Sequence, residues 1–399
     1  MGLNTISLRS QLEDAPFSGE STSGTDSGRC AVRFLSPAGA ANASMLGPPV
    51  ANSPSIRSFL ETFYKYNHHT WENQYLYVID RPCYINTATG TIFSDSGECY
   101  SETVYPSSGE RTVERLIGGG LSEDNISDSL ASATEVKSDA FVVPLLSRWS
   151  NVYFHAVTES LVQDHALLTS AGELELLYAA PQAVAAVQDL VIKNASLPVR
   201  RFDSQLIRVD RAVTTSLLYS HSLMNYDFVN FINTVRKDHF ASIACSVPKL
   251  ARYGKRIFIS RKGALARQMK NEAELVESLR GIGFEIFDSH GLDFRRQAAA
   301  FAGATFVVGA HGAGLTNAAF AMPGAVLLEL RPLNRSGESP MWGMSYKNLS
   351  SVMGFSYCAH VSENEENSEE WIANVPEIMQ TIGLILADMD NWRSSLAGV

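Results

Sequence analysis

Short apolar runs alternate with longer segments of helical periodicity in the second half of the chain. The strands predicted from these runs cover residues 256–260, 284–287, 305–310 and 325–330. Between them, residues 271–283 and 293–304 repeat apolar positions every three to four residues, as amphipathic helices do, and a short helix is predicted after residue 314. Strands joined through helices make right-handed crossovers, so this half predicts a parallel sheet covered by helices on both faces.

The first half shows the same alternation less regularly. Residues 141–146 form an apolar run typical of a buried strand, and apolar positions then recur at helical spacing from Asn151 to Leu168. Aromatic and β-branched residues alternate with turn residues over 55–114, which predicts short strands with Thr89-Gly90 closing a hairpin. A helix over 227–243 leads into a polar stretch that marks a domain boundary.

The chain has 399 residues, more than one core of about 250–300 residues accommodates, so we expect two domains. Residues 1–54 are rich in Ser, Gly, Ala and Pro, which predicts a disordered or irregular N-terminal arm. The expected parts are the arm at 1–54, an acceptor-side α/β domain at 55–245, a donor-nucleotide α/β domain at 250–360, and a helical segment at 365–399 packing back on the N-terminal domain. The predicted fold class is α/β, with two Rossmann-like domains facing a cleft.

Charge and cysteine content exclude several classes of protein. The net charge of −10, from 32 basic and 42 acidic residues, argues against a sequence-independent nucleic-acid binder, which needs a basic face. The five cysteines are scattered and none has zinc-site spacing, so reduced thiols are expected. The sequence holds neither an apolar run near the ~20 residues of a membrane span nor an N-terminal secretory signal, which favours a cytoplasmic protein.

Three features of the second half stand at predicted strand ends, where open α/β sheets bind ligands. The loop from Gly309 to Gly314 lets backbone N–H groups approach a phosphate at a helix N-terminus. Arg261 and Arg267 offer guanidinium groups to a diphosphate, and Glu329 can accept hydrogen bonds from ribose hydroxyls. A tight turn, surface arginines and a carboxylate paired to Arg331 are the alternative interpretations. Together the three features favour a nucleoside-diphosphate site.

A histidine and a carboxylate share one helix face in the first half. His155 and Glu159 are four residues apart, so either could take a proton from an acceptor hydroxyl. The alternative is a helix-surface pair that only adds stability. The Asp388-x-Asp390 pair resembles a metal-holding motif, but it falls inside a predicted helix and is interpreted as a solvated face.

These motifs resemble those of glycosyltransferase family 61. Residues 307–330 look like its HGAGLTN…F…PG…E signature, residues 256–287 resemble its Arg…Arg…Asn-Glu segment, and residues 151–161 match its Asn-x-x-x-His-x-x-x-acid helix. The resemblance covers residues 140–335 and implies a GT-B fold, inversion at the anomeric carbon and no required metal. Carried over by position, it implies donor contacts from Arg261, Arg267, His311, Gly312, Ala313, Gly314, Leu315, Thr316 and Glu329. It places Glu159 and His155 on the catalytic side.

We therefore expect an inverting, metal-independent transferase that moves a sugar from a nucleotide-sugar donor, UDP-linked by preference, to a hydroxyl of a glycan or glycolipid. The resemblance implies a role in surface polysaccharide biosynthesis and is compatible with peripheral association with the inner face of a membrane. The nucleotide sugar is a co-substrate and no cofactor is expected. The alternative is a non-catalytic regulatory or scaffold protein that binds a nucleoside diphosphate. Such a protein would tolerate Glu159→Gln.

Overall fold

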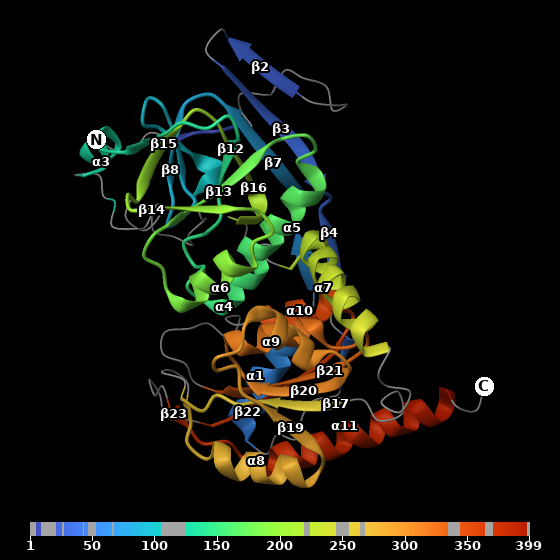
Figure 1. Cartoon of the computed structure of the whole chain (residues 1–399). Helices are drawn as coiled ribbons and strands as arrows, with labels where there is room; N and C mark the ends of the chain where they lie inside the picture. The colour runs from blue at the N-terminus through green and yellow to red at the C-terminus, as the bar shows by residue number, and fades with distance from the viewer. Residues whose placement is uncertain are drawn as a thin grey trace. The chain divides into compact units, whose positions relative to one another are not determined.

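The computed structural model describes residues 5–8, 21–25, 28–42, 44–46, 53–65, 68–104, 121, 125–218, 224–244, 255–263, 268–333, 344–363 and 370–396. The chain forms two compact units (Figure 1). Unit 1 comprises Met1–Gly39 and Thr70–Phe231, and unit 2 comprises Ala40–His69 and Ile232–Val399. The chain passes from unit 1 to unit 2 between Phe231 and Ile232, inside helix α7 (Tyr226–Ala244). The polar stretch after this helix is therefore not the domain boundary.

Unit 2 is built on one parallel sheet with the order β19-β17-β20-β21-β22-β5. Its strands are β17 (Lys255–Ile259), β19 (Phe284–Phe287), β20 (Ala304–Ala310), β21 (Val326–Pro332), β22 (Ser356–Ser362) and β5 (Ser44–Met45). Counted along the chain from β17, the first five have the order 2-1-3-4-5. The direction of winding therefore reverses between β17 and β20, which is where doubly wound sheets bind ligands.

Helices cover both faces of this sheet, as the sequence predicted. They are α1 (Pro54–Lys65), α8 (Glu272–Gly281), α9 (Phe294–Phe301), the 3₁₀ segment η5 (Ala313–Phe320), α10 (Ser345–Met353) and α11 (Val375–Leu396). Figure 1 shows α8 and α11 on one side of the sheet and α9 and α10 on the other. A two-stranded ribbon of β18 (Gln268–Met269) and β23 (Glu370–Trp371) lies beside them.

Local chemistry explains where the helices begin and end. Asp293 caps α9, since its side chain accepts a hydrogen bond from the backbone N–H of Arg296 at 2.8 Å. Helix α8 has acidic residues in its first turn and Arg280 in its last, which suits the helix dipole. Gly283, with φ of 84°, then turns the chain into β19.

Unit 1 contains two sheets. The larger has the order β14-β13-β12-β16-β7-β3-β2. Its strands are β14 (Val199–Phe202), β13 (Leu176–Pro181), β12 (Phe141–Pro144), β16 (Ala212–Thr215), β7 (Gln74–Asp80), β3 (Gly28–Ser36) and β2 (Ser21–Thr25). The strands from β14 to β16 run parallel, and those from β16 to β2 pair antiparallel. The four residues of β12 are all buried, as a strand with parallel neighbours on both sides requires.

The smaller sheet has the order β1-β10-β9-β8-β15-β11. Its strands are β1 (Thr5–Ile6), β10 (Cys99–Tyr100), β9 (Ile92–Ser94), β8 (Cys83–Asn86), β15 (Leu206–Val209) and β11 (Thr134–Val136). Gly90, with φ of 79°, closes the β8–β9 hairpin and confirms the predicted turn. The two sheets share a core that includes Ile79, Ile85, Val142 and Ile207.

The helical segments of unit 1 lie between these strands. They are η2 (Ser101–Thr103), α3 (Ile126–Ala131), α4 (Tyr153–His155), the π-helical turn η3 (Ala156–Ser160), α5 (Leu161–Ser170), α6 (Ala186–Asn194) and η4 (Ser216–Leu218). The helix predicted from Asn151 is thus interrupted by one wider turn. Strand β4 (Gly39–Asn42) pairs with β6 (His68–Trp71) where the chain passes between the units.

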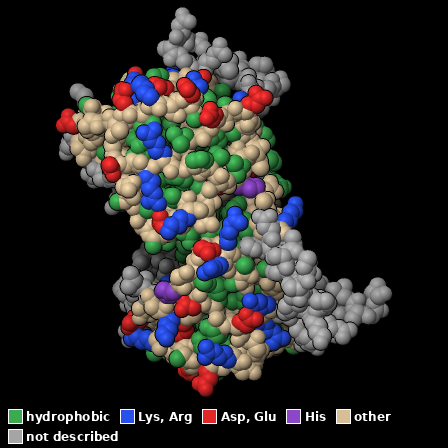
Figure 2. Space-filling model, in the orientation of Figure 1, with side chains coloured by type: hydrophobic (Ala, Val, Ile, Leu, Met, Phe, Trp, Pro, Cys, Tyr) green, Lys and Arg blue, Asp and Glu red, His purple; other side chains and the backbone are tan. Residues whose placement is uncertain are grey.

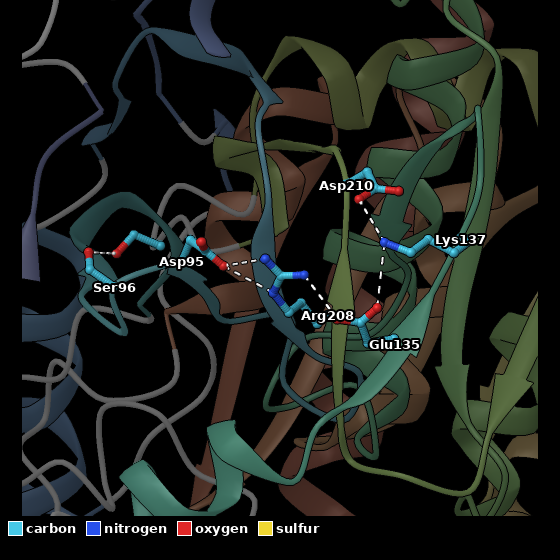
Figure 3. A network of polar contacts seen from close by, with 7 residues as sticks. Asp95, Ser96, Glu135, Lys137, Arg208 and Asp210 are labelled. Atoms are coloured by element: carbon cyan, nitrogen blue, oxygen red, sulfur yellow. Dashed lines mark hydrogen bonds and ion pairs between the residues drawn. The ribbon is translucent and has the colours of Figure 1, made fainter. Parts of the chain in front are cut away.

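Ion pairs join the outer strands of the smaller sheet (Figure 3). Arg208 of β15 lies 2.7 Å from Asp95 and 3.0 Å from Glu135, measured from its terminal nitrogens to the carboxylate oxygens. Lys137 continues the network from Glu135 to Asp210. Exposed pairs of this kind contribute little each, so the buried core holds the strands together. Basic and acidic side chains are interspersed over the face of the molecule shown in Figure 2.

The structure corrects the expected division of the chain in three places. Residues 28–36 form a strand of the larger sheet and not an irregular arm. Residues 55–65 form a helix of unit 2, and helix α11, expected to pack on the N-terminal domain, also belongs to unit 2, where it packs on α8. The stripe Ile378, Ile382 and Ile385 is buried in the core under β17, β20 and β21. The periodicity of α11 predicts such a stripe, but it does not say which sheet the stripe covers.

Candidate functional site

Two loops meet at the point where the winding of the unit 2 sheet reverses. Arg261 follows β17, and the loop from His311 to Gly314 follows β20. A Cβ atom built on Gly312 would lie 1.6 Å from Nη1 of Arg261, so the guanidinium group rests directly on the glycine backbone. Gly312 has φ of 160°, an extended conformation open to any residue. Glycine is therefore needed here for space and not for backbone freedom.

The start of α8 fixes the backbone of Arg261. Glu272 accepts a hydrogen bond from Oγ of Ser260 at 2.5 Å and another from the backbone N–H of Arg261 at 3.0 Å. The main chain after β17 is thus tied to the first helical turn, while the long arginine side chain reaches across to the next loop. Glu272 belongs to the segment that resembles the family's Arg…Arg…Asn-Glu pattern, but the sequence assigned it no role.

A buried carboxylate holds the histidine of the second loop. Glu329 of β21 bonds to Nδ1 of His311 through one oxygen, and its other oxygen accepts the hydroxyl of Tyr357 at 2.5 Å. Glu329 is fully buried. Burial alone would raise its pKa, but the nearby Arg331 and His311 lower the pKa below its usual value. Both oxygens of Glu329 are thus engaged within the protein, so it orients His311 and does not present a free face to a ribose.

Positive charge accumulates around this carboxylate. Nη1 of Arg331 lies 3.8 Å from Glu329, and the side chain of Lys347, from α10, is only 1% exposed. Burial, reinforced by the charge of Arg331 and opposed by that of Glu329, lowers the pKa of Lys347 to about 8. We call Arg261, His311, Gly312, Glu329, Arg331 and Lys347 the His311 cluster. The cluster contains three cationic side chains, of which Arg331 and Lys347 interact with its one carboxylate, and this excess of positive charge favours binding of an anion.

A second histidine–carboxylate pair lies in unit 1, on the helix after β12. Nδ1 of His155 lies 2.6 Å from Oε1 of Glu159, and Oγ of Ser147 donates to the other oxygen of Glu159. Glu159 is fully buried, whereas the His155 side chain is 21% exposed. Ser147 is itself held by Ser150 at 3.0 Å between hydroxyl oxygens. The pair spans the π-helical turn Ala156–Ser160, a local widening that often occurs at functional sites.

Residues 125–328 match the family described as Glycosyltransferase 61, which is about half of the chain. The chain belongs to glycosyltransferase family 61. The match confirms the resemblance found in the motifs and makes the protein a glycosyltransferase. No curated protein matches the chain.

The matched segment of this glycosyltransferase contains the His155–Glu159 pair and part of the His311 cluster. It includes His155, Glu159, Arg261 and the loop at 311–314, and it ends one residue before Glu329. Ala313 and Gly314 are partly exposed at the start of η5. Leu315 and Thr316, also predicted as donor contacts, are buried in the core, where Leu315 packs against Gly309. Arg267 lies outside the described residues.

The glycosyltransferase uses the same arrangement of groups in both units. In each, a fully buried glutamate bonds to Nδ1 of a histidine and accepts a hydroxyl on its other oxygen, from Ser147 in one case and Tyr357 in the other. In each pair, Nδ1 is the ring nitrogen that the glutamate engages. The sequence named all four of these residues, and it gave Arg331 as a partner of Glu329 in the alternative interpretation. It missed the two hydroxyls and Lys347. No local pattern indicates these groups, which come from other elements.

In the described part of the chain, no helix combines the length and the apolar character that crossing a membrane requires. Asp388 lies exposed within α11, inside a helix as predicted, and the side chain of Asp390 lies outside the described residues.

Proposed function

We propose that this glycosyltransferase transfers a sugar from a UDP-linked donor to a hydroxyl of a glycan acceptor, with inversion at the anomeric carbon and without a required metal ion. The observation that carries the proposal is the His311 cluster at the reversal point of a parallel sheet. Diphosphates bind at such points because strand ends, backbone N–H groups and cations converge there.

The donor half of the mechanism is electrostatic. The Arg261 guanidinium, resting on Gly312, bonds to diphosphate oxygens, and Nε2–H of His311 donates to the same group. When the bond from the anomeric carbon to the diphosphate oxygen breaks, negative charge grows on that oxygen. Fixed donors and the charges of Arg331 and Lys347 stabilise the growing charge without rearrangement.

The acceptor half uses His155 as the base. The sequence left the choice between His155 and Glu159 open, and the geometry favours the histidine. Both oxygens of the buried Glu159 are already hydrogen-bonded, whereas Nε2 of the partly exposed His155 can take a proton. The acceptor hydroxyl gives its proton to Nε2, its oxygen attacks the anomeric carbon, and Glu159 stabilises the imidazolium that forms.

Thermal unfolding of the purified protein with UDP, GDP, CMP, ADP and NAD tests the donor half. A nucleotide at 100 times its dissociation constant adds ~2.7 kcal/mol, which raises the Tm of a domain of 150–250 residues by roughly 5–11 °C. We expect this rise with UDP, and we expect Arg261→Ala to abolish it. Arg280→Ala, which removes an exposed arginine from α8, is the matched control and keeps the rise. If no nucleotide raises Tm, or if only NAD does, the proposed donor site is wrong.

Turnover of the UDP-sugar, measured as UDP release, tests the base. His155→Ala should reduce turnover by about 10²-fold or more, the scale of general-base losses, while UDP still binds. Glu159→Gln keeps the shape of the side chain and should reduce turnover less than His155→Ala. Full activity of His155→Ala together with an inactive Glu159→Gln would assign the base to Glu159. UDP binding without any turnover would indicate a non-catalytic nucleotide-binding protein.

A further inference from the structure

A large aromatic side chain is exposed next to the proposed base. Trp149 lies in the loop between β12 and α4 and is 39% exposed. Its ring centroid is 6.1 Å from that of His155, and the two ring planes are inclined by 33°. By contrast, Trp71 and Trp371 are buried. Among the tryptophans whose side chains the structure describes, the exposed one is thus beside the histidine that our mechanism uses.

The structure holds this ring firmly despite its exposure. Arg148 places its guanidinium carbon 5.2 Å from the centroid of the Trp149 ring, a cation–π contact. The backbone N–H of Val152 donates to the carbonyl of Trp149 at 2.8 Å, and Ser147 and Ser150 bond to one another across the same loop. The exposed indole is therefore part of a closed, hydrogen-bonded turn. A rigid aromatic surface can bind a ligand at little cost in conformational entropy.

We propose that Trp149 binds the acceptor, as a stacking surface for a neutral pyranose ring that carries the reacting hydroxyl. A pyranose with equatorial substituents has an apolar face of C–H groups that packs on an indole, while its hydroxyls point outward at the rim. Val152, also 39% exposed, and the exposed Asn151 lie in the same turn, and Arg148, whose guanidinium lies over the indole ring, supplies further hydrogen-bond donors. This inference rests on the proposed function, because the stacked sugar would present its hydroxyl to His155.

Binding can be measured without knowing the natural acceptor. The protein labelled with 5-fluorotryptophan has five tryptophans, and Trp149→Phe identifies the ¹⁹F signal of Trp149. We expect methyl β-D-glucopyranoside to shift this signal in a saturable way. Mannitol, a polyol without a ring face, should leave it in place. An unmoved Trp149 signal, or equal shifts with both compounds, would overturn the inference.

Variants separate failure of this inference from failure of the proposed function. Trp149→Ala should weaken binding of the glucoside, and raise KM for an acceptor, by about 3- to 10-fold, the range of one aromatic contact. UDP binding should stay unchanged. Leu168→Ala, which removes another exposed apolar side chain from unit 1, is the control and should change neither quantity. If UDP binds and transfer occurs but Trp149→Ala leaves KM for the acceptor unchanged, only the role of Trp149 fails. If UDP does not bind and no transfer occurs, the proposed function itself fails.

Discussion

Gly312→Ala probes the contact on which the donor site depends. The new Cβ would lie 1.6 Å from Nη1 of Arg261, where real Cβ contacts are not shorter than 3.0 Å, so the guanidinium must retreat by at least 1.4 Å. The backbone of Gly312 is extended, so alanine causes no strain in the main chain. Glu272 fixes the backbone of Arg261, and so the side chain must swing away while the loop stays in place.

The expected loss is that of the arginine's bonds to the nucleotide. A hydrogen bond to a charged group contributes about 1.5–3 kcal/mol. Losing one weakens the binding of UDP by roughly 10- to 150-fold, because each 1.4 kcal/mol is a factor of ten. The free energy of unfolding without nucleotide should change by less than ~1 kcal/mol, since only the end of a flexible side chain moves.

Isothermal titration with UDP measures the effect, and the same loop offers a control. A Cβ on Gly314 would be 3.3 Å from Cγ2 of Ile259, a tight contact that a small shift relieves, so Gly314→Ala should bind UDP within about 3-fold of the wild type. Combining Gly312→Ala with Arg261→Ala should add nothing to Arg261→Ala alone, because both remove one interaction. Binding of UDP to Gly312→Ala with wild-type affinity would refute the reasoning, and so would an equal loss in Gly314→Ala.

Two further predictions concern pH. The ring of His360 is 1% exposed, its nitrogens have no hydrogen-bond partner among the described residues, and burial lowers its pKa to about 4 from 6.5. The unfolded chain thus binds this proton at higher pH than the folded protein, so the free energy of unfolding should fall by ~3 kcal/mol as pH drops from 6.5 to 4. Urea unfolding should show a flatter profile over this window for His360→Leu, and a slope equal to that of the wild type would contradict the assignment. Because the pKa of Lys347 is about 8, its charge and the affinity for UDP should fall between pH 7 and 9. Titrations of Lys347→Met should show weaker binding without that fall, and a fall of the same size would exclude Lys347 as its source.

The sequence predicted the strands and helices of unit 2 well up to Pro332, because each strand there is a short apolar run with a helix beside it. It missed β22, whose residues 356–362 mix serines and a histidine with apolar side chains. That strand is buried by its position next to β21, which composition does not reveal. Strands β2 and β3 of the unit 1 sheet were missed for a related reason. Strand β3 pairs with β7, from Arg29 opposite Asp80 to Ser36 opposite Gln74, and such long-range pairing leaves little trace in a local pattern.

In the candidate sites, too, the sequence predicted what depends on local spacing and missed what depends on contacts with distant residues. The spacing of His155 and Glu159 predicted that they face one another, and their atoms lie 2.6 Å apart. The sequence could not predict that Glu159 is the more buried of the two, because the hydroxyl that bonds to it comes from Ser147, in the loop before the helix. The pairing of His311 with Glu329 could in principle have been predicted from the alignment of the two strands. Glu329 is opposite Gly309 in neighbouring parallel strands, two residues before the histidine.

The two histidine–glutamate pairs suggest how one arrangement serves two purposes. Each glutamate is fully buried and each histidine side chain is more exposed than its glutamate, so in the mechanism we propose the carboxylates position the imidazoles and the imidazoles contact the reacting groups. The surroundings then decide the chemistry. His311 shares its glutamate with the cations Arg331 and Lys347, a setting that suits a donor to an anion. His155 has a serine hydroxyl behind its glutamate and the indole of Trp149 beside it. A base that must take a proton from a neutral sugar hydroxyl is better placed in such a setting than among fixed cations, which would oppose its protonation.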